Sequence, residues 1–478
     1  IISFFTIFLF YFTKEHYFWS DDYGYILGTK IFIQLNEKGI GITDAVSIIW
    51  PGNHYVPFFS YYNQFMPDRA EHFHLIIICA HGLTSYFLLL ICKEIYNVKH
   101  FPLLASMFYF FNMGINSAAI NYNMLSPHII VSLTGILSIY FLIKYFKSNN
   151  RIHFLLLQTL FLILTTFNFE SSFLFITIIY ILIFFYPIKL KNKILVFVLN
   201  SIPIIFYFGL TIMISGNIHP LLTERLKADH SQNEIVKKNK EIYPIYVNRS
   251  NYAERNLNNY IIRASENLLN SVNVGAYEYL IKKYLSKKDK DLIKKNVLKN
   301  LNVLLLIFSF LIFAFFLISL KYFIKKKNDH KLLFFLGIYL LMLFLTSVVY
   351  FRKDICMALA FISSILLAHV VIDLIKIRKV MVILFLITFF SPSIIYIFGG
   401  MQYAYGDYNK STAREIFLNY KNLSQKELKI LNLQDLNSDL DFKYYYFFKN
   451  LNKYKIELNS IDKKNLITFH DSFAKHQF

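Results

Sequence analysis

The sequence has 478 residues, of which 56% are hydrophobic, and a formal net charge of +20. Uncharged apolar stretches of about 18–22 residues recur along it, long enough to cross a hydrocarbon core of about 30 Å, and this excludes a soluble globular fold. The lysines and arginines lie between those stretches, so the positive charge indicates membrane topology and contact with anionic lipid rather than nucleic-acid binding. We therefore expect an all-α polytopic membrane protein.

About eleven membrane spans are expected in chain order. The apolar block 152–187 is too long for one span, and a turn near Asn168–Glu170 is expected to divide it. Because residue 1 is Ile and the first apolar run ends near Phe12, the first span is expected to begin upstream of residue 1. The spans lie near residues 1–13, 75–92, 101–119, 125–146, 153–168, 170–187, 194–215, 301–320, 332–350, 355–375 and 380–399.

The charges of the short connections predict the orientation of the chain. Sixteen lysines and arginines fall in one alternating set of connections, whereas the other set, 117–124, 168–170 and 351–354, contains two. By the positive-inside rule the first set is cytoplasmic, and the first span ends outside. The lysine-rich stretch Lys282–Lys299 then lies outside, because long loops translocate largely regardless of charge. The cytoplasmic connections are 93–100, 144–151, 188–193, 321–331 and 376–379.

Two parts of the chain are expected. Residues 1–400 form the transmembrane domain, with outer loops at 14–74 and 216–300. Residues 401–478, rich in Tyr, Asn and Lys, form a small α-rich extension on the non-cytoplasmic side. The compositional bias toward Lys, Asn, Ile and Phe is typical of an AT-rich bacterial genome. The expected location is therefore a bacterial inner membrane, with the site on its periplasmic or extracellular face.

An acidic pair, Asp21–Asp22, directly follows the first span. Two adjacent carboxylates at a membrane surface raise each other's pKa and are repelled by anionic lipid, so they require an explanation. They are either a solvated helix cap or a general base at the membrane–water boundary, and the residues alone leave both readings open.

Histidines and cysteines also fall in the predicted spans. His74 and His81 are seven residues apart and therefore share one helix face. Such a pair is a proton relay, a pair of metal ligands or a pair of hydrogen-bond partners for neighbouring helices, and the last reading is favoured. Cys79, Cys92 and Cys356 lie in or at the ends of apolar spans, so we expect no disulfide. The sequence has no C-x-x-C or H-E-x-x-H spacing, and no cofactor is evident.

Two further charged positions lie in short outer connections. Glu170 is at the tip of the 152–187 hairpin, where an acid is either hydrated or directed into a cavity. Arg352 and Lys353 form a basic pair on the side where the charge rule expects none. A bound phosphate group would account for that pair.

These features, in this order, resemble the GT-C membrane glycosyltransferases. The acidic pair after the first span is followed by a His-Tyr-x-Pro segment at His54 and by the sequence Phe73–His81. The closest resemblance is to the dolichyl-phosphate-mannose–protein mannosyltransferase-like proteins and their bacterial relatives. In that group a His-Leu-x-Asn…His pattern often begins the second span, and here Ile77 replaces the Asn. A lysine that often precedes the acid at the position of Glu170 is also missing.

The resemblance covers residues 1–400 in layout and implies a transferase that uses a polyprenyl-phosphate sugar. It implies Asp21 as the catalytic base, with Asp22 beside it and Glu170 as a supporting acid. Arg352 and Lys353 would bind the donor phosphate. The side chains implied to line the acceptor part of the site are Asn53, His54 and Asn123.

The implied partners are a polyprenyl-phosphate-linked sugar, a glycan, lipid or protein acceptor, and membrane lipids, with no nucleic acid. In a bacterium the carrier would be undecaprenyl phosphate. No metal ligand set is evident, although Asp22, His54 and Glu170 would suffice for a divalent ion if they converged.

Two other function classes share part of this pattern. A transporter or lipid flippase would have charged or helix-breaking residues within paired spans and internal repeats, whereas the acids here cluster on one side and no repeat is seen. A polysaccharide polymerase or ligase would also act at the outer face. Such enzymes more often depend on arginines in long outer loops than on an acid pair after the first span.

Overall fold

A computed structural model shows a helical bundle. It describes residues 1–13, 70–112, 115–116, 127–148, 151–167, 172–215, 257–271, 273, 318, 321–322, 324–325, 329–348, 357–395 and 397. All regular structure in these residues is helical. The predicted extension 401–478, the predicted span 301–320 apart from Ile318, and the outer loop 14–74 up to residue 69 lie outside the described residues.

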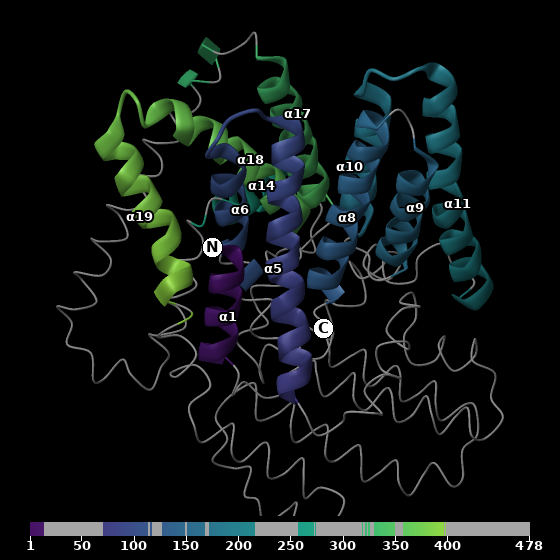
Figure 1. Ribbon diagram of the computed structural model, residues 1–478, viewed down its shortest axis with the longest axis horizontal. Coiled ribbons are helices and arrows are strands. Elements are labelled where there is room, and N and C mark those ends of the chain that lie inside the picture. The colour runs from purple at the N-terminus through teal and green to yellow at the C-terminus, as the bar shows by residue number, and fades with distance from the viewer. Residues whose placement is uncertain are drawn as a thin grey trace, which may run out of the picture.

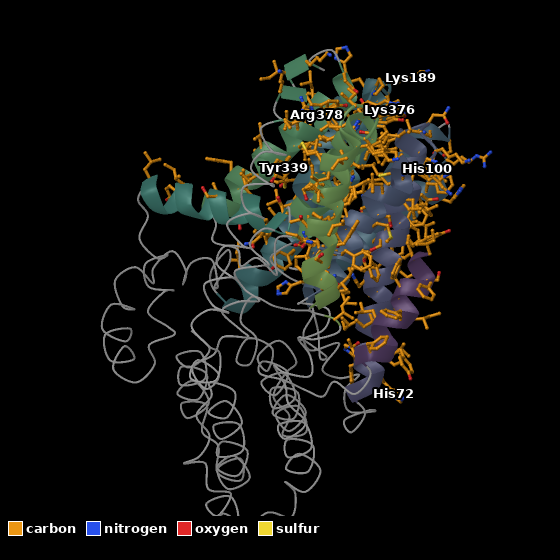
Figure 2. All side chains as sticks on the ribbon, turned by 90° about the vertical axis from the view of Figure 1, so that its left-hand side faces the viewer. His72, His100, Lys189, Tyr339, Lys376 and Arg378 are labelled. Carbon is orange, nitrogen blue, oxygen red and sulfur yellow. The ribbon has the colours of Figure 1, made fainter. Side chains whose placement is uncertain are left out.

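The long helices lie side by side along one direction of the bundle, whereas α14 lies across it (Figure 1 and Figure 2). In the described residues, five are long and apolar enough to cross a membrane, which indicates an integral membrane protein. The helices are α1 (Ile2–Thr13), α5 (Ala70–Ile95), α6 (Phe101–Phe110), α8 (Pro127–Lys147), α9 (Ile152–Thr166), α10 (Ser172–Phe185), α11 (Leu190–Ser215), α14 (Leu257–Ser271), α17 (His330–Val348), α18 (Met357–Leu374) and α19 (Lys379–Ile395).

Two predictions about the helices have different outcomes. The apolar block 152–187 forms two helices, α9 and α10, so its predicted division is confirmed, while the predicted turn near Asn168–Glu170 lies outside the described residues. The expected span near 101–119 is not one uninterrupted helix, because α6 ends at Phe110. The side chain of Asn112 accepts a hydrogen bond from the N–H of Ile115 (3.3 Å), and Asn116 donates to the carbonyl of Phe110 (2.9 Å). These short polar side chains bond the backbone locally and so compete with continuation of the helix.

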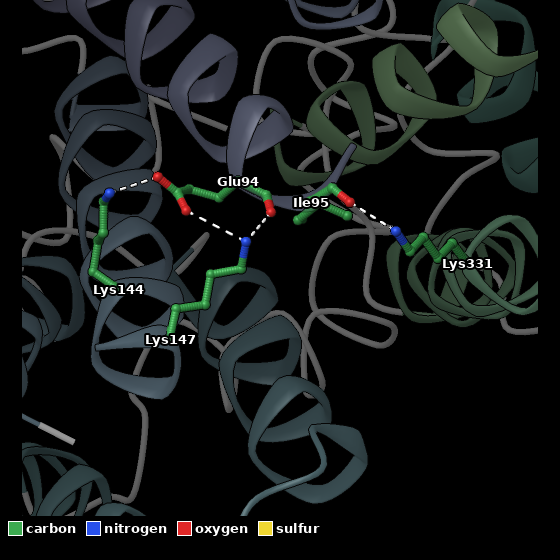
Figure 3. A network of polar contacts seen from close by, with 5 residues as sticks. All are labelled: Glu94, Ile95, Lys144, Lys147 and Lys331. Atoms are coloured by element: carbon green, nitrogen blue, oxygen red, sulfur yellow. Dashed lines mark hydrogen bonds and ion pairs between the residues drawn. The ribbon is translucent and has the colours of Figure 1, made fainter. Parts of the chain in front are cut away.

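One end of the bundle, here called the basic end, carries the positive charge. Lys144 and Lys147 of α8 pair with Glu94 of α5 at 2.5 and 3.4 Å, and Lys331 of α17 donates to the carbonyl of Ile95 (Figure 3). Such exposed pairs contribute only about 0–1 kcal/mol each, so they show which helix ends adjoin more than they stabilise the fold. Figure 2 shows the same segregation, with His100, Lys189, Lys376 and Arg378 at one end and His72 at the other.

The segment that precedes α17 also has a residue at the basic end. The hydroxyl of Tyr322 donates to a carboxylate oxygen of Asp373, near the end of α18 (2.7 Å). Burial and the bond to Asp373 raise the pKa of Tyr322 above its ordinary value. With Lys189, Lys376 and Arg378 at the same end in Figure 2, residues from all five connections 93–100, 144–151, 188–193, 321–331 and 376–379 lie at the basic end.

Helix α18 is the central element of the bundle. It packs against α6, α8, α14, α17 and α19, and nearly all of its side chains are buried. Its sequence contains Ala358, Ala360, Ser363, Ser364 and Ala368, all buried. Small residues allow neighbouring backbones to approach closely, which is how helices pack in a membrane without a hydrophobic driving force between them.

Buried amides also join the helices α8, α9 and α11. The side chain of Gln158 on α9 donates to Ser138 of α8 (3.1 Å) and to Asn200 of α11 (2.6 Å). All three residues are fully buried. Hydrogen bonds of this kind between membrane helices contribute about 1 kcal/mol and fix which helix faces meet.

Two glycines permit the closest helix contacts. A Cβ atom on Gly82 of α5 would lie 2.3 Å from the hydroxyl oxygen of Thr6 on α1, and one on Gly135 of α8 would lie 2.6 Å from the ring of Phe175 on α10. Gly209 of α11 and Gly337 of α17 have no atom within 4 Å of the same position, because they face outward.

We expect Gly135→Leu and Gly82→Leu to destabilise the protein by about 1–3 kcal/mol, since the added side chain forces neighbouring helices apart. Gly209→Leu and Gly337→Leu are matched controls and should leave stability unchanged or slightly higher. Thermal unfolding in detergent measures the difference. Equal stability of all four variants would contradict the close approach of α8 to α10 and of α1 to α5.

Candidate functional site

The sequence-predicted site residues lie in four segments outside the described residues. Asp21, Asp22, Asn53 and His54 fall in 14–69, Asn123 in 117–126, Glu170 in 168–171, and Arg352 with Lys353 in 349–356. The structure does describe the helices on which these segments begin and end. The positions of those helix termini therefore show where each of the four segments begins or ends.

Apart from the residues just before 117–126, the helix termini next to these segments lie at the end of the bundle opposite the basic end. The hydroxyl of Thr13, the last residue of α1, is 2.5 Å from the Nε2 atom of His74, near the start of α5. Both side chains are buried. The segment 14–69 thus leaves the bundle and returns to it at one place.

The other three segments lead into α8 and into two helices that contact it, α10 and α18. Ser132, in the second turn of α8, donates to the sulfur of Met357, the first residue of α18 (2.9 Å). Gly135 of α8 faces Phe175 in the first turn of α10. The starts of α8, α10 and α18, which follow the segments with Asn123, Glu170 and Arg352, are therefore neighbours.

A second polar region lies inside the bundle, where the short helix α6 ends. Ten residues of α6 extend about 15 Å from the basic end, roughly half the thickness of a membrane core. The carbonyl of Phe110 accepts hydrogen bonds from His81 Nε2 (3.1 Å) and from Asn116 (2.9 Å). The carbonyl of Phe111 accepts bonds from Asn273 (2.8 Å) and Ser393. Four side-chain donors thus satisfy the carbonyl groups that the helix end leaves without backbone partners.

Helix α14 completes this interior polar region. Figure 2 shows α14, coloured teal, entering the bundle from the side, across the direction of the long helices. Asn267 donates to Thr346 (3.1 Å), and the hydroxyl of Ser271 lies 2.7 Å from that of Tyr339, both on α17. Asn273, directly beyond the helix, donates to the carbonyls of Phe111 and Phe389 at 2.8 Å each.

The side chains of this interior region are neutral, so it is equipped to hold helix ends and hydroxyl groups rather than a charged substrate. Leu257 and Ile261 are exposed at the start of α14, whereas Asn267 and Ser271 are buried. The region therefore anchors a described part of the loop 216–300 within the bundle. Intramembrane polar residues commonly mark functional regions, and this one includes a helix of the predicted outer loop 216–300.

The favoured reading of the two histidines is confirmed. His74 bonds Thr13 of α1, and His81 bonds the end of α6, so each contacts a different neighbouring helix. Among the described residues, no three His, Cys, Asp or Glu side chains are grouped closely enough to bind a metal ion. In the same part of the chain Cys79 and Cys92 are free thiols.

Sequence reasoning did not identify Asn112, Asn116, Asn267 or Asn273 as parts of one cluster. Asparagines within a predicted span, as at Asn112 and Asn116, are the signal that could have pointed to it, because an amide in the membrane requires hydrogen-bond partners. The pairing with Asn273 joins positions far apart in the sequence and has no sequence signal.

No family model matches the chain, and no curated protein or solved structure gives a significant match.

Proposed function

We propose that this protein is a membrane-embedded glycosyltransferase of the GT-C type. It moves one sugar from a polyprenyl-phosphate donor to an acceptor hydroxyl on a glycan, lipid or protein. The reaction takes place at the end of the bundle opposite the basic end.

The observation that carries this proposal is the gathering of helix termini at that end. The eight candidate residues lie in four segments far apart in the sequence, and all four adjoin termini at one end. The Thr13–His74 and Ser132–Met357 contacts join these termini in pairs. A site built from several loops at one end of a rigid bundle is the usual way in which a scaffold positions catalytic groups.

The membrane topology is part of the proposal. Eleven spans place the basic end in the cytoplasm and the opposite end in the periplasm or outside the cell. Helix α11 starts at the basic end and leads away from it to Ser215, whereas Tyr322 and the start of α17 lie at the basic end again. This supports one further crossing of the membrane between Ser215 and Tyr322. The apolar stretch 301–320 supplies that crossing.

In the proposed reaction, the acceptor hydroxyl attacks the anomeric carbon of the sugar. Asp21 takes the hydroxyl proton, while Asp22 and Glu170 support the site and Asn53, His54 and Asn123 line it. The bond between the anomeric carbon and the phosphate oxygen breaks, and its electron pair leaves with the polyprenyl phosphate. Because that leaving group is a stable anion, it requires no proton, and Arg352 with Lys353 stabilises its charge.

Reconstitution of the full chain in liposomes tests the function. Polyprenyl-phosphate sugars labelled in the sugar, one hexose and one pentose, are supplied with bacterial cell-envelope glycans as acceptor. We expect label to enter the acceptor and one equivalent of polyprenyl phosphate to be released, with inversion at the anomeric carbon. If neither donor is consumed while the protein remains folded, the proposed function is wrong.

One observation favours a second candidate, a lipid transporter or flippase. Helix α6 is interrupted about halfway through the bundle by buried polar groups, a feature of transport proteins. The described interior, however, has no charged side chain at that depth to bind a transported ion or headgroup. In the liposome experiment, movement of intact labelled donor across the bilayer without cleavage would select the transporter.

A further inference from the structure

The first residue of α10 presents an unsatisfied polar group. The hydroxyl of Ser172 is fully buried and has no hydrogen-bond partner, although a buried hydroxyl normally has one. Other hydroxyls on the same part of the chain are satisfied: Thr177, one turn further along α10, donates to the carbonyl of Phe173 (2.7 Å). Ser172 therefore has a free donor at the helix terminus.

The terminus itself adds further donors. The first four backbone N–H groups of an α-helix have no acceptor within the helix, and the helix dipole places a partial positive charge there. Helix α10 has 14 residues, long enough for this effect to be developed. A buried helix start with a spare hydroxyl is suited to an anion.

Two neighbouring helices start at the same end. Gly135 of α8 lies against Phe175, so Ser172, three residues earlier, is about level with Ser132 of α8. Ser132 also bonds Met357, the first residue of α18. The starts of α10 and α18 thus lie at about the same depth beside α8, and α8 begins about 7 Å farther out, at Pro127. Three helix dipoles consequently direct their positive ends to one region.

The described residues provide little other charge there. Apart from Arg263 of α14, every described lysine and arginine belongs to the segments that form the basic end. Those residues are Lys93, Lys99, Lys144, Lys147, Arg151, Lys189, Lys191, Lys193, Lys321, Lys325, Lys331, Lys376, Arg378 and Lys379. In this part of the chain the opposite end therefore offers an anion donors other than lysine and arginine, and the Ser172 hydroxyl with the first-turn N–H groups of α10 is one such set.

We propose that the start of α10, through the hydroxyl of Ser172 and the backbone N–H groups of the first turn, binds a phosphate group. If the proposed function holds, this group is the phosphate of the polyprenyl-phosphate donor and of the leaving lipid. The site lies beside the region where the donor sugar is transferred, because the segment with Glu170 ends at Ser172. Ser172 is a binding residue in this assignment, and it takes no proton.

Lipid binding by the purified full chain tests the site without requiring turnover. The protein is placed in phosphatidylcholine nanodiscs and titrated with a polyprenyl phosphate and, separately, with the polyprenol of the same length. We expect the phosphate to bind at least 10-fold more tightly than the alcohol. Ser172→Ala should weaken phosphate binding about 10-fold, because a hydrogen bond to a charged group is lost, and Ser172→Thr should retain it.

Ser172→Asp separates an anion site from a structural role. A carboxylate at a helix start favours the helix, so thermal stability should be kept, yet its charge should abolish phosphate binding. Thr177→Ala removes a hydroxyl that is satisfied within its own helix and should bind like the wild type. Wild-type affinity in Ser172→Asp, or equal affinity for phosphate and polyprenol, would overturn the proposal.

Two competitors identify the source of the phosphate group. Displacement of the polyprenyl phosphate by inorganic phosphate supports a site for the bare group. Displacement only by phosphatidylglycerol added to the disc supports a site for lipid headgroups, and displacement by neither supports selectivity for the polyprenyl lipid. Binding that depends on Ser172 without any sugar transfer would keep the site and reject the glycosyltransferase. Sugar transfer that is unchanged by Ser172→Asp would keep the glycosyltransferase and reject the phosphate site at Ser172.

Discussion

Replacing Asp21 by Asn is expected to lower sugar transfer about 10²–10⁴-fold while leaving donor binding intact, because an amide cannot accept the proton of the attacking hydroxyl. Asp22→Asn should have a smaller effect, since Asp22 only supports the neighbouring carboxylate. Transfer of labelled sugar from the polyprenyl-phosphate donor, measured in liposomes at saturating donor, gives the comparison.

Asp44→Asn is the matched control, because it makes the same change of charge within the same predicted outer loop. It should transfer sugar at the wild-type rate. Transfer by Asp21→Asn at the wild-type rate would remove Asp21 from the role of base. Loss of transfer in all three variants would instead point to the total charge of the loop.

Replacing Asn273 by Ala is expected to give one of the larger losses of stability, about 2–4 kcal/mol. The amide of Asn273 bonds the carbonyls of Phe111 and Phe389, so it joins α14 to the end of α6 and to the middle of α19, and loss of both bonds costs about 1–3 kcal/mol. Asn273 also has a φ of 64°, in the left-handed region, where Ala costs about 1 kcal/mol more than Gly.

Asn273→Gly separates these two contributions, since glycine adopts the left-handed backbone freely but cannot make the bonds. It should be less destabilising than Asn273→Ala by about 1 kcal/mol. Ser265→Ala on α14 is the control, because that exposed hydroxyl bonds only its own helix, at Ile261. Unfolding in detergent and the rate of tryptic cleavage at Arg263 measure stability and release of α14. Unchanged cleavage in both Asn273 variants would show that other contacts hold α14 in place.

The long helices were predictable because a membrane imposes their length. Helices α5, α8, α17 and α18 each contain an 18-residue stretch of high mean hydropathy, and each lies within a few residues of its expected range. The hairpin of α9 and α10 was predictable for the same reason, since 152–187 is too long for one crossing. Physical length and charge distribution are properties of the chain alone.

The interior polar region was not predictable in the same way. Asn112 interrupts a stretch that average hydropathy identifies as one span, because its effect depends on a single side chain bonding the backbone. Helix α14 has a polar, amphipathic sequence within a long loop, and nothing local shows that its end is buried against Tyr339 and Thr346. These contacts exist only once distant helices have packed.

The sequence by itself therefore determined the class of protein, the positions of most helices, the basic end and a set of candidate site residues named through family resemblance. Tertiary structure decided that helix starts far apart in the sequence gather around α8, and that Ser172 is buried there without a partner. The physical reason is that the hydropathy and charge of a segment depend only on the residues within it. Convergence of helix dipoles and satisfaction of buried hydrogen bonds depend instead on which helices become neighbours.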